Sequence, residues 1–538
     1  MSYLSGTRLH FAGEFSATPS TINNSICNYD PQVTRPQPGW NPNGPAYWQF
    51  QNCRVSSLVT AGGTSSGDPL LGAALSTPGQ PPAKLVDLDP MQQGASQIFG
   101  MEVQVGSSDS ASFSATFHPV AFGDLWGRAQ GGAQGDMAFS AYYQSVLEEV
   151  LWANVDGSDF LKALQSATAC GRLSIKFVVD GYNTGTKRGR VVGTIGPYLE
   201  GEPVKFVAGR YLRPHVRQVT FGPAWVDEEN SKLVVDLGNS LPTESAGGGP
   251  MNLGNLQVVI LHADARPEVL GDFDYSLAAY GRTAYVQEFE LSEGQLRSLA
   301  RTPLGVIESN TATLVMAENP MGAYLNAEQA VYRISPGQKE KVRVWALQFG
   351  KPAAHQEIGL SFARGALGGP VSCRGGRITL PVAQPESALS LPSSVTTRSE
   401  GQAEFELLAA DPGNPRHFVD GQVYPVQYLW GTGEDPSYRR DPSNILSVLV
   451  HNAYEVPEHP TWDADVQPIF SQYAKLYPVM KPIVDLSSYQ SVKDNASSVE
   501  RVFGLSVDNP GYMPVTRDLS PAKQQMVLRW FSQGAPEN

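Results

Sequence analysis

Apolar and polar residues alternate along much of the first half of the chain, which predicts β-strands. The alternation is clear in "TRLHFAGEFSA" and in "RLSIKFVVDGYNTG", each of which runs into a glycine-containing turn. The stretch "QVTFGPAWVDEENSKLVVDLGNS" predicts a hairpin that turns at the acidic and amide cluster of residues 227–230. Two stretches have helical spacing instead, at residues 137–155 and 158–171, and the second begins with a Ser-Asp cap and stops at Gly171.

Short strands recur beyond a glycine-rich stretch at residues 243–254. Segments such as "NLQVVILHADA" and "KVRVWALQFG" have the spacing of a sandwich, and "SEGQLRSLAR" predicts a short helix with a Ser-x-x-Gln capping box. The segment "TTRSEGQAEFEL" turns at Glu-Gly, as strands of immunoglobulin-like sandwiches often do. Three amphipathic helices follow, at residues 461–480, 487–504 and 520–531, and the third has a Ser cap followed by Pro.

These patterns predict a mainly β chain with several sandwiches, a few helices and a small all-α unit at the C-terminal end. A chain of 538 residues is too long for one core, and its 53 glycines and 41 prolines suit short strands joined by turns. We divide the chain into a β-rich domain with one or two helices (1–245), a β domain (246–375), an immunoglobulin-like sandwich (376–455) and an α-helical unit (456–538).

Charge and hydropathy exclude several classes of partner. The formal net charge of -13 disfavours nucleic acid, because no basic stripe offsets repulsion from phosphates. No apolar run approaches the roughly 18 residues that span a bilayer, so we expect no membrane insertion. The opening "MSYLSGTRLHFAGEF" lacks the charged and apolar regions of a secretory signal. We therefore expect a cytoplasmic protein.

The four cysteines are widely spaced and match neither a zinc pattern nor a disulfide framework. They are Cys27, Cys53, Cys170 and Cys373. Buried free thiols are the preferred interpretation, and a bridge between Cys27 and Cys53 is left open.

No catalytic or metal-binding motif of high specificity is present. The eight histidines include no pair four residues apart in a helix, and the serine-rich loops are not Gly-x-Ser-x-Gly elbows. His10 lies in an alternating strand and is interpreted as a hydrogen-bonded structural histidine. His451 and His459 flank a turn, and we interpret them as surface residues rather than metal ligands.

Four basic residues gather in "VAGRYLRPHVRQ", namely Arg210, Arg213, His215 and Arg217. Guanidinium groups suit carboxylate ligands, so this cluster is the candidate site for an anionic small molecule. The preferred alternative is ion pairing between strands with the surplus acidic residues.

The C-terminal stretch "YMPVTRDLSPAKQQMVLRWF" resembles the close of a small cytochrome c domain. The chain has no Cys-x-x-Cys-His, so no covalent haem can form and we predict no cofactor. We interpret the stretch as a structural clamp made by Tyr512, Met513, Arg517, Asp518 and Trp530. Non-covalent haem held by Met513 or Tyr477 is the alternative.

Three blocks carry a family likeness: "RLHFAGEFSATPSTINN", residues 173–214, and "FSQYAKLYPVM" through "YMPVTRDLSPAK" at residues 470–523. In order and spacing they resemble the N-terminal, non-ferritin half of the chromopyrrolate synthase and violacein-pathway family, the iminophenylpyruvate dimer synthases. The ferritin-like half, to which that family's oxidative coupling of tryptophan-derived imines is referred, is absent from this sequence. We therefore transfer no catalytic residue.

The resemblance implies an accessory subunit or enzyme of bacterial secondary-metabolite biosynthesis from amino acids. It would act in a complex with a separate ferritin-like or oxidase chain. The alternative is a stand-alone β protein that binds a ligand or a protein, or has a structural role, without catalysis. A third hypothesis is an enzyme that uses a pocket near Arg210 and Arg213.

Overall fold

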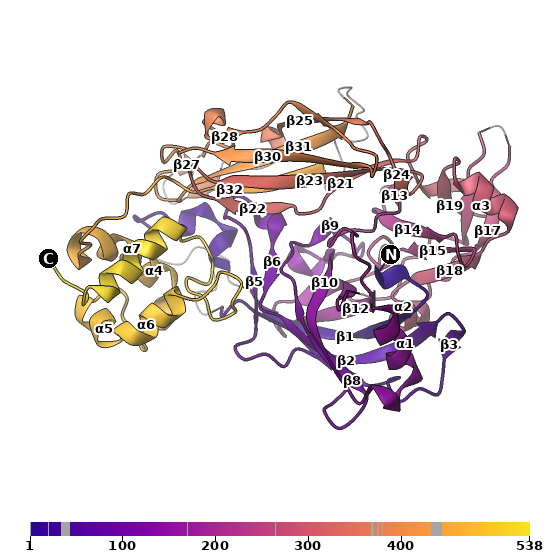
Figure 1. Cartoon of the computed structure of the whole chain (residues 1–538), viewed down its shortest axis with the longest axis horizontal. Helices are drawn as coiled ribbons and strands as arrows, with labels where there is room; N and C mark the ends of the chain where they lie inside the picture. Colours follow the sequence, from indigo (N-terminus) through magenta and orange to yellow (C-terminus); the bar gives the residue numbers. More distant parts are fainter. Residues whose placement is uncertain are drawn as a thin grey trace.

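The computed structural model describes most of the chain, and the account below refers to that part. The described residues are 2–19, 21–33, 44–168, 170–263, 265–366, 371–373, 376–378, 380–431 and 444–538. In Figure 1 the first strands and the strands of residues 200–320 lie below and beside a sandwich that runs across the top, and the C-terminal helices sit at one end. The predicted fold class, mainly β with a helical C-terminal unit, is confirmed.

The first sheet closes on itself because β2 pairs with both β4 and β1. The closed ring runs β1-β12-β11-β10-β8-β7-β4-β2, and β3, β5, β6 and β9 extend it. Its strands are β1 (Arg8–Thr18), β2 (Tyr47–Thr60), β3 (Gly63–Ser65), β4 (Ala74–Ser76), β5 (Ala83–Val86), β6 (Gln97–Phe99), β7 (Glu102–Val105), β8 (Ser112–Phe117), β9 (Gly123–Gly127), β10 (Phe139–Ala153), β11 (Leu173–Asn183) and β12 (Arg188–Pro197).

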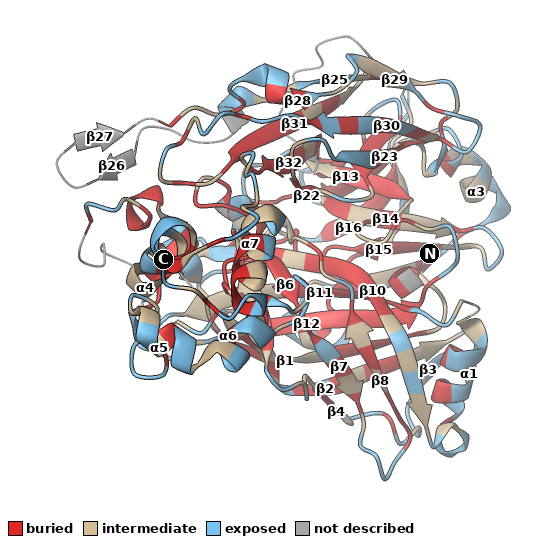
Figure 2. Ribbon diagram, turned by 60° about the vertical axis from the view of Figure 1, so that its left-hand side comes forward, coloured by how far each residue is buried: buried red, intermediate tan, exposed pale blue. Residues whose placement is uncertain are grey.

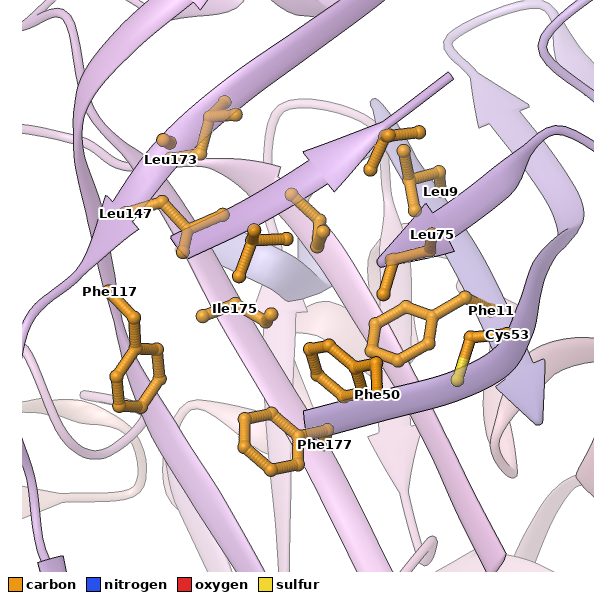
Figure 3. Close-up of a cluster of buried hydrophobic side chains, with 14 of the residues drawn as sticks. Leu9, Phe11, Phe50, Cys53, Leu75, Phe117, Leu147, Leu173, Ile175 and Phe177 are labelled. Atoms are coloured by element: carbon orange, nitrogen blue, oxygen red, sulfur yellow. The ribbon is translucent and has the colours of Figure 1, made fainter. Parts of the chain in front are cut away.

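The interior of this ring is filled by apolar side chains from every part of it. Figure 3 shows Phe11, Phe50 and Phe177 meeting there, and Phe50 and Phe177 lie 5.3 Å apart between ring centres. Strand alternation places Ile175 and Phe177 inside, whereas Lys176 and Val178 face outward. The ring is therefore a packed core with a second, outward-facing contact surface.

One prediction in this region is wrong: residues 137–155 do not form a helix. Phe139–Ala153 is strand β10, which pairs with β11 on one edge and with β8 and β9 on the other. The register with β8 shifts after Glu148, and Glu149 has a positive φ of 53°, so a bulge interrupts the alternation. That interruption made the apolar spacing look helical. The neighbouring helix α1 (Asp159–Ala167), capped by Ser158, is confirmed.

A second sheet packs against the outward face of β11 and β12. Its strand order is β17-β16-β19-β20-β13-β14-β15-β18. The bounds are β13 (Arg210–Pro214), β14 (Gly222–Asp227), β15 (Lys232–Asp236), β16 (Leu256–Ile260), β17 (Glu268–Asp272), β18 (Val286–Glu290), β19 (Leu304–Glu308) and β20 (Thr313–Ala317), with helices α2 (Leu277–Thr283) and α3 (Glu293–Leu299). The β14–β15 hairpin and the capping box at Ser292 match the predictions.

The third unit is a sandwich of two facing sheets that share one apolar core. One sheet has the order β21-β23-β30-β28 with β24 beside β23, and the other β22-β32-β31-β25-β29. The bounds are β21 (Ala323–Ala327), β22 (Val331–Ile334), β23 (Lys339–Gln348), β24 (Lys351–Pro352), β25 (Glu357–Phe362), β28 (Leu389–Ser390), β29 (Ser394–Thr396), β30 (Gln402–Ala409), β31 (Gln422–Trp430) and β32 (Ile445–Val450), with a separate hairpin of β26 (Val371–Cys373) and β27 (Gly376–Ile378). Figure 2 shows β31 mostly buried, whereas β30 alternates between buried and exposed residues.

The sheets cross two of the predicted domain boundaries. The second sheet runs from β13 to β20, so residue 245 lies within it, and the sandwich begins at β21, so residue 375 lies within it. Strands distant in sequence pair in both units. The spacing of the strands along the chain could not show this pairing.

The C-terminal unit is helical, as predicted. It contains a π-turn at Trp462–Val466 followed by α4 (Gln467–Leu476), α5 (Tyr489–Asp494), α6 (Ala496–Phe503) and α7 (Pro521–Ser532). The predicted helix at 487–504 is divided at Asn495. The unit shares its core with short 3₁₀ turns near the N-terminus, η2 (Thr21–Asn24) and η3 (Ile26–Asn28).

The cysteines divide into two kinds. Cys27 is disulfide-bonded, whereas Cys53 and Cys170 are free thiols. A Cys27–Cys53 bridge is therefore excluded, and the preference for free thiols is wrong for Cys27. The side chain of Cys373 lies outside the described residues.

Candidate functional site

A cavity of about 380 Å³ opens at one end of the closed ring. Most of its apolar lining residues belong to the ring's interior core, so the cavity is the mouth of that interior. The mouth of a closed sheet is a common place for a small-molecule site, because the strands give a rigid wall and the opening gives access. We call this cavity the ring pocket.

Aromatic side chains form one wall of the ring pocket. Phe15 on β1 stacks between Trp48 on β2 and Tyr182 on β11, with ring centres 6.1 and 5.9 Å away. The Tyr182 hydroxyl donates to the carbonyl of Ala17 at 2.9 Å, which holds its ring in place. This wall presents flat apolar faces suited to an aromatic or otherwise planar ligand.

Asp87 is the distinctive polar group of the ring pocket. It directly follows β5, and Ser96 directly precedes β6; because Val86 pairs with Gln97, the two face each other across the hairpin. The Ser96 hydroxyl donates to Asp87 Oδ1. Burial raises the pKa of the Asp87 carboxyl to about 7, the nearby charge of Asp136 adds to the rise, and the Ser96 hydrogen bond opposes it.

The opposite wall comes from β10 and the segment before β9. Phe122 and Tyr143 meet edge to face there, 6.0 Å apart between ring centres. Burial and the charge of Asp87 raise the pKa of the Tyr143 hydroxyl, which therefore stays protonated and able to donate. Tyr143 also stacks on Phe177 at 5.2 Å, so its orientation is set by the core.

A second carboxylate at the pocket wall, that of Asp180, is already neutralised by two arginines. Asp180 Oδ2 accepts from Arg128 at 2.8 Å and from Arg190 at 2.7 Å. Burial alone would raise the pKa of Asp180, but these two guanidinium groups bring it below its ordinary value. Asp136 also lines the ring pocket but is exposed. Asp87, with a pKa near 7, can exchange a proton near neutral pH, the property of a general acid or base.

No local pattern in the sequence predicts the ring pocket. Asp87 stands in "KLVDLDP", directly after an apolar strand, and its aromatic neighbours come from residues far apart in the chain. An acid directly after a strand was the one local signal available. Nothing local indicated that Trp48 or Tyr143 would lie in the same pocket.

The predicted arginine cluster is not gathered into one site. Arg210 is buried, and its Nε donates to Glu318 at 2.9 Å while its other nitrogens reach the carbonyls of Leu299 and Thr302 at 2.8 and 2.7 Å. His215 and Arg217 are exposed beyond the end of β13. A ligand could use Arg210 only by displacing Glu318. The anionic-ligand prediction therefore rests on Arg213, His215 and Arg217, and it stays a prediction.

Three histidines were assigned roles from the sequence, and the structure shows the surroundings of each. His10 is buried, and its ring nitrogens contact Thr194 Oγ1 at 2.9 Å and Arg8 Nε at 3.3 Å, which confirms the structural interpretation. His459 is exposed, as predicted. The surface interpretation is wrong for His451, which directly follows β32 and is buried. Within the described ranges, no three His, Cys, Asp or Glu side chains could together hold a metal ion.

The five residues of the predicted clamp lie in the core of the helical unit or at its edge. Arg517 donates to the carbonyls of Val515 and Asn509 at 2.5 and 3.0 Å, and its guanidinium lies 4.5 Å over the Phe99 ring. Asp518 accepts from Tyr473 at 3.2 Å. The remaining members are the buried Tyr512 and Trp530 and the partly buried Met513. The contact between Arg517 and Phe99 joins the helical unit to the first sheet, and the clamp role of the five residues stays a prediction.

The haem alternative finds little support in this core. The Tyr477 hydroxyl donates to Thr516 Oγ1 at 2.9 Å, and Met513 packs against the shared apolar cluster. A haem iron would have to displace these contacts. The residues present do not fit an axial ligand set, and we derive no chemistry through haem.

Comparisons with known proteins identify no family. No family model matches the chain, and no curated protein does so. A solved structure of the superantigen toxic shock syndrome toxin-1 aligns at 14% identity over 24% of this chain and 98% of its own, with a TM-score of 0.14. The S-layer protein SbsC aligns through its domains 4 and 5 at 9% identity over 39% of this chain and 95% of its own, TM-score 0.15. Its domains 1–6 align at 7% identity over 72% of this chain and 51% of their own, TM-score 0.16, and scores this low carry no argument.

Proposed function

We propose that the chain binds a small aromatic molecule in the ring pocket and exchanges a proton with it through Asp87. The observation that carries the proposal is a carboxyl with a pKa of about 7 in a pocket walled by stacked aromatic rings. The rings supply the apolar contact area, and the carboxyl supplies one polar contact that fixes orientation. A ligand with an N–H or O–H donor suits this pocket better than an anion does.

The family resemblance suggests the setting. An aromatic pocket is consistent with an accessory subunit or enzyme in secondary-metabolite biosynthesis from aromatic amino acids. Partnership with a separate ferritin-like or oxidase chain remains part of the proposal. The described residues include no helix long and apolar enough to cross a membrane. A cytoplasmic location also remains a proposal, and the disulfide at Cys27 disfavours it, because such bonds persist mainly in oxidising compartments.

The test is calorimetric titration of the chain with indole, which has one N–H donor, and with benzoate as an anion of similar size. We expect indole to bind and benzoate to be rejected at pH 8, where Asp87 is ionised. Asp87→Asn should weaken indole binding by about ten-fold or more, the value of a hydrogen bond to a charged acceptor. Asp109→Asn, an exposed residue of the same unit, is the matched control and should leave binding unchanged.

Binding of indole that is equally tight in Asp87→Asn would remove Asp87 from the site. It would favour the alternative of a binding module without catalysis, because the aromatic wall alone would then account for affinity. A chain that gives no heat with either compound would contradict the ring pocket as a ligand site.

A further inference from the structure

A second cavity lies on the other side of β10, where three units of the fold meet. Its volume is about 300 Å³, and it is lined by residues from the first sheet, the loop before β13 and the sandwich strands β22 and β32. Tyr142 and Gln144 on β10 face this cavity, whereas Tyr143 faces the ring pocket. Phe122 and Leu125 line both cavities and therefore separate them. We call this second space the junction cavity.

Lys205 brings an amine to the junction cavity without a counter-charge. It lies in the loop between β12 and β13, followed by the buried residues Phe206 and Val207. In the part of the chain that the structure describes, no hydrogen bond or ion pair to its amine is found. Burial is the sole cause that lowers the pKa of Lys205, which falls to about 8. A substantial fraction of this amine is therefore neutral at physiological pH.

Asp124 and Gln92, two other polar residues of the cavity, are hydrogen-bonded to neighbouring side chains. The Asp124 carboxylate accepts from Thr220 Oγ1 at 2.9 Å and from the Asn239 side chain at 3.3 Å. The Gln92 amide nitrogen donates to Ser447 Oγ at 2.5 Å. These bonds join the first sheet to the sandwich and to the second sheet, so they hold the cavity walls together.

The side chain of Gln92 is a second, independent observation that indicates a ligand in this cavity. Its side chain is 7% exposed, and its amide oxygen has no hydrogen-bond partner among the described residues. A buried acceptor without a donor is unfavourable by about 1–3 kcal/mol unless something supplies that donor. The cavity thus offers a free nucleophilic amine and an unsatisfied acceptor within one enclosed space.

We propose that Lys205 forms an imine with the carbonyl group of a small molecule bound in the junction cavity. The neutral Nζ attacks the carbonyl carbon, the C=O π bond breaks, and a proton from nitrogen passes to the oxygen. Loss of the resulting hydroxyl with the second amine proton then gives the C=N bond and one water molecule. Gln92 accepts a hydrogen bond from the hydroxyl of the carbinolamine intermediate.

This chemistry is independent of the ring pocket and needs no oxidant or metal. Lysine imines form where a desolvated amine loses its proton readily, as here. The substrate class is an aldehyde or ketone small enough for a cavity of about 300 Å³. Because the cavity walls come from three units, the site exists only when the whole chain is folded.

The test is reductive trapping of the full chain with benzaldehyde and sodium cyanoborohydride, followed by peptide mass spectrometry. At pH 7.5 an amine with a pKa near 8 has on the order of 100 times the neutral fraction of an ordinary lysine. Lower intrinsic nucleophilicity offsets part of this, so we expect Lys205 to be alkylated at least ten-fold faster than the exposed Lys162 and Lys351. The pH dependence of the Lys205 rate should have its midpoint near 8.

The matched variants are Lys205→Arg and Lys351→Arg. The first should abolish the fast alkylation and leave the other lysines unchanged, and the second should leave the fast alkylation intact. Alkylation of Lys205 no faster than Lys162, or a rate midpoint near 10, overturns the proposal. The trapping is done on the unmodified chain, so this outcome does not depend on how either variant folds.

Discussion

Lys176 and Lys205 are near neighbours of Tyr142 but differ in how their charge is balanced. Lys176 Nζ lies 4.7 Å over the Tyr142 ring and 2.5 Å from Asp236 Oδ2, with both side chains less than 5% exposed. Lys205 lines a cavity together with Tyr142, but among the described residues no carboxylate pairs with it. The same residue type is a structural ion pair in one place and a reactive amine in the other. Lys176 has a carboxylate partner, whereas none pairs with Lys205 among the described residues.

The buried and partly buried carboxylates differ in the same way, because some have a cationic partner and one does not. Asp180 is held ionised by Arg128 and Arg190, and Glu318 is paired with Arg210 and accepts the backbone N–H of Leu304 at 2.7 Å. Asp87 directly follows β5 of the same sheet, and among the described residues its carboxyl has the hydroxyl of Ser96 as its close donor. Buried groups with full partners stabilise the junctions of the sheets. Asp87 and Lys205, which are partly buried and have no ionic partner among the described residues, line the two cavities.

Removing the carboxylate partner of Lys176 should change the stability of the folded chain more than any other substitution considered below. Asp236→Ala would leave the ammonium of Lys176 buried without a counter-charge and would remove the acceptor of Tyr3, which lies 2.8 Å away. We expect the free energy of unfolding to fall by about 3–5 kcal/mol. Denaturant unfolding measures this, with Glu293→Ala as the control. Glu293 pairs with Arg297 at the surface, and its loss should change stability by less than about 0.5 kcal/mol. Equal losses of stability in the two variants would show that the buried ion pair contributes no more than the surface ion pair.

Asp87→Asn should raise the free energy of unfolding, whereas Asp236→Ala lowers it, and the size of the increase should depend on pH. The folded chain keeps a proton on Asp87 up to about pH 7, whereas the unfolded chain loses it near pH 4. The unsubstituted chain therefore loses stability as pH rises between these values. We expect Asp87→Asn to be more stable than the unsubstituted chain by roughly 3 kcal/mol at pH 8, with the gap closing by pH 4. Thermal unfolding across this range measures it, and a gap that does not vary with pH would show that Asp87 titrates normally.

Lys205→Met should stabilise the folded chain by less than Asp87→Asn does, and its stabilising effect should shrink as pH rises instead of growing. Below about pH 8 the amine is charged in both states, so its partial burial destabilises the folded chain. Between about pH 8 and 10.5 the folded chain has released a proton that the unfolded chain retains, and stability rises with pH. We expect the variant to be more stable by roughly 1–2 kcal/mol at pH 7 and equal near pH 10.5, after allowing for partial exposure. A variant less stable at pH 7 would indicate that the charge has a partner.

Arg213→Ala should have the smallest effect on stability. The residue pairs with Ala317 through the backbone of β13 and β20, a contact that the substitution leaves in place. We expect a change below about 1 kcal/mol in unfolding free energy and weaker binding of a small inorganic anion such as phosphate. Calorimetric titration at low salt measures the second quantity. A large loss of stability without any change in binding would make Arg213 a structural residue.

Local signals in the sequence were sufficient for elements whose stability is set within a few residues. The caps at Ser158, Ser292 and Ser520 each accept a hydrogen bond from a backbone N–H three residues later, and the predicted helices begin there. The β14–β15 hairpin follows from its polar turn in the same way. The strand β10 could not be identified because its bulge breaks the alternation and only its pairing partners distinguish it from a helix.

The sequence by itself determined the fold class, the capped helices and the hairpins, since these depend on contacts between near neighbours along the chain. Tertiary structure alone decided where the sheets close and which charges are compensated. Val331 and Ser447 become neighbours on parallel strands of the sandwich, and Lys205 joins them in one cavity from the loop between β12 and β13. The pKa values of Asp87 and Lys205 follow from desolvation by such distant residues. No local pattern encodes that desolvation, because its free energy depends on which surfaces the folded chain removes from water.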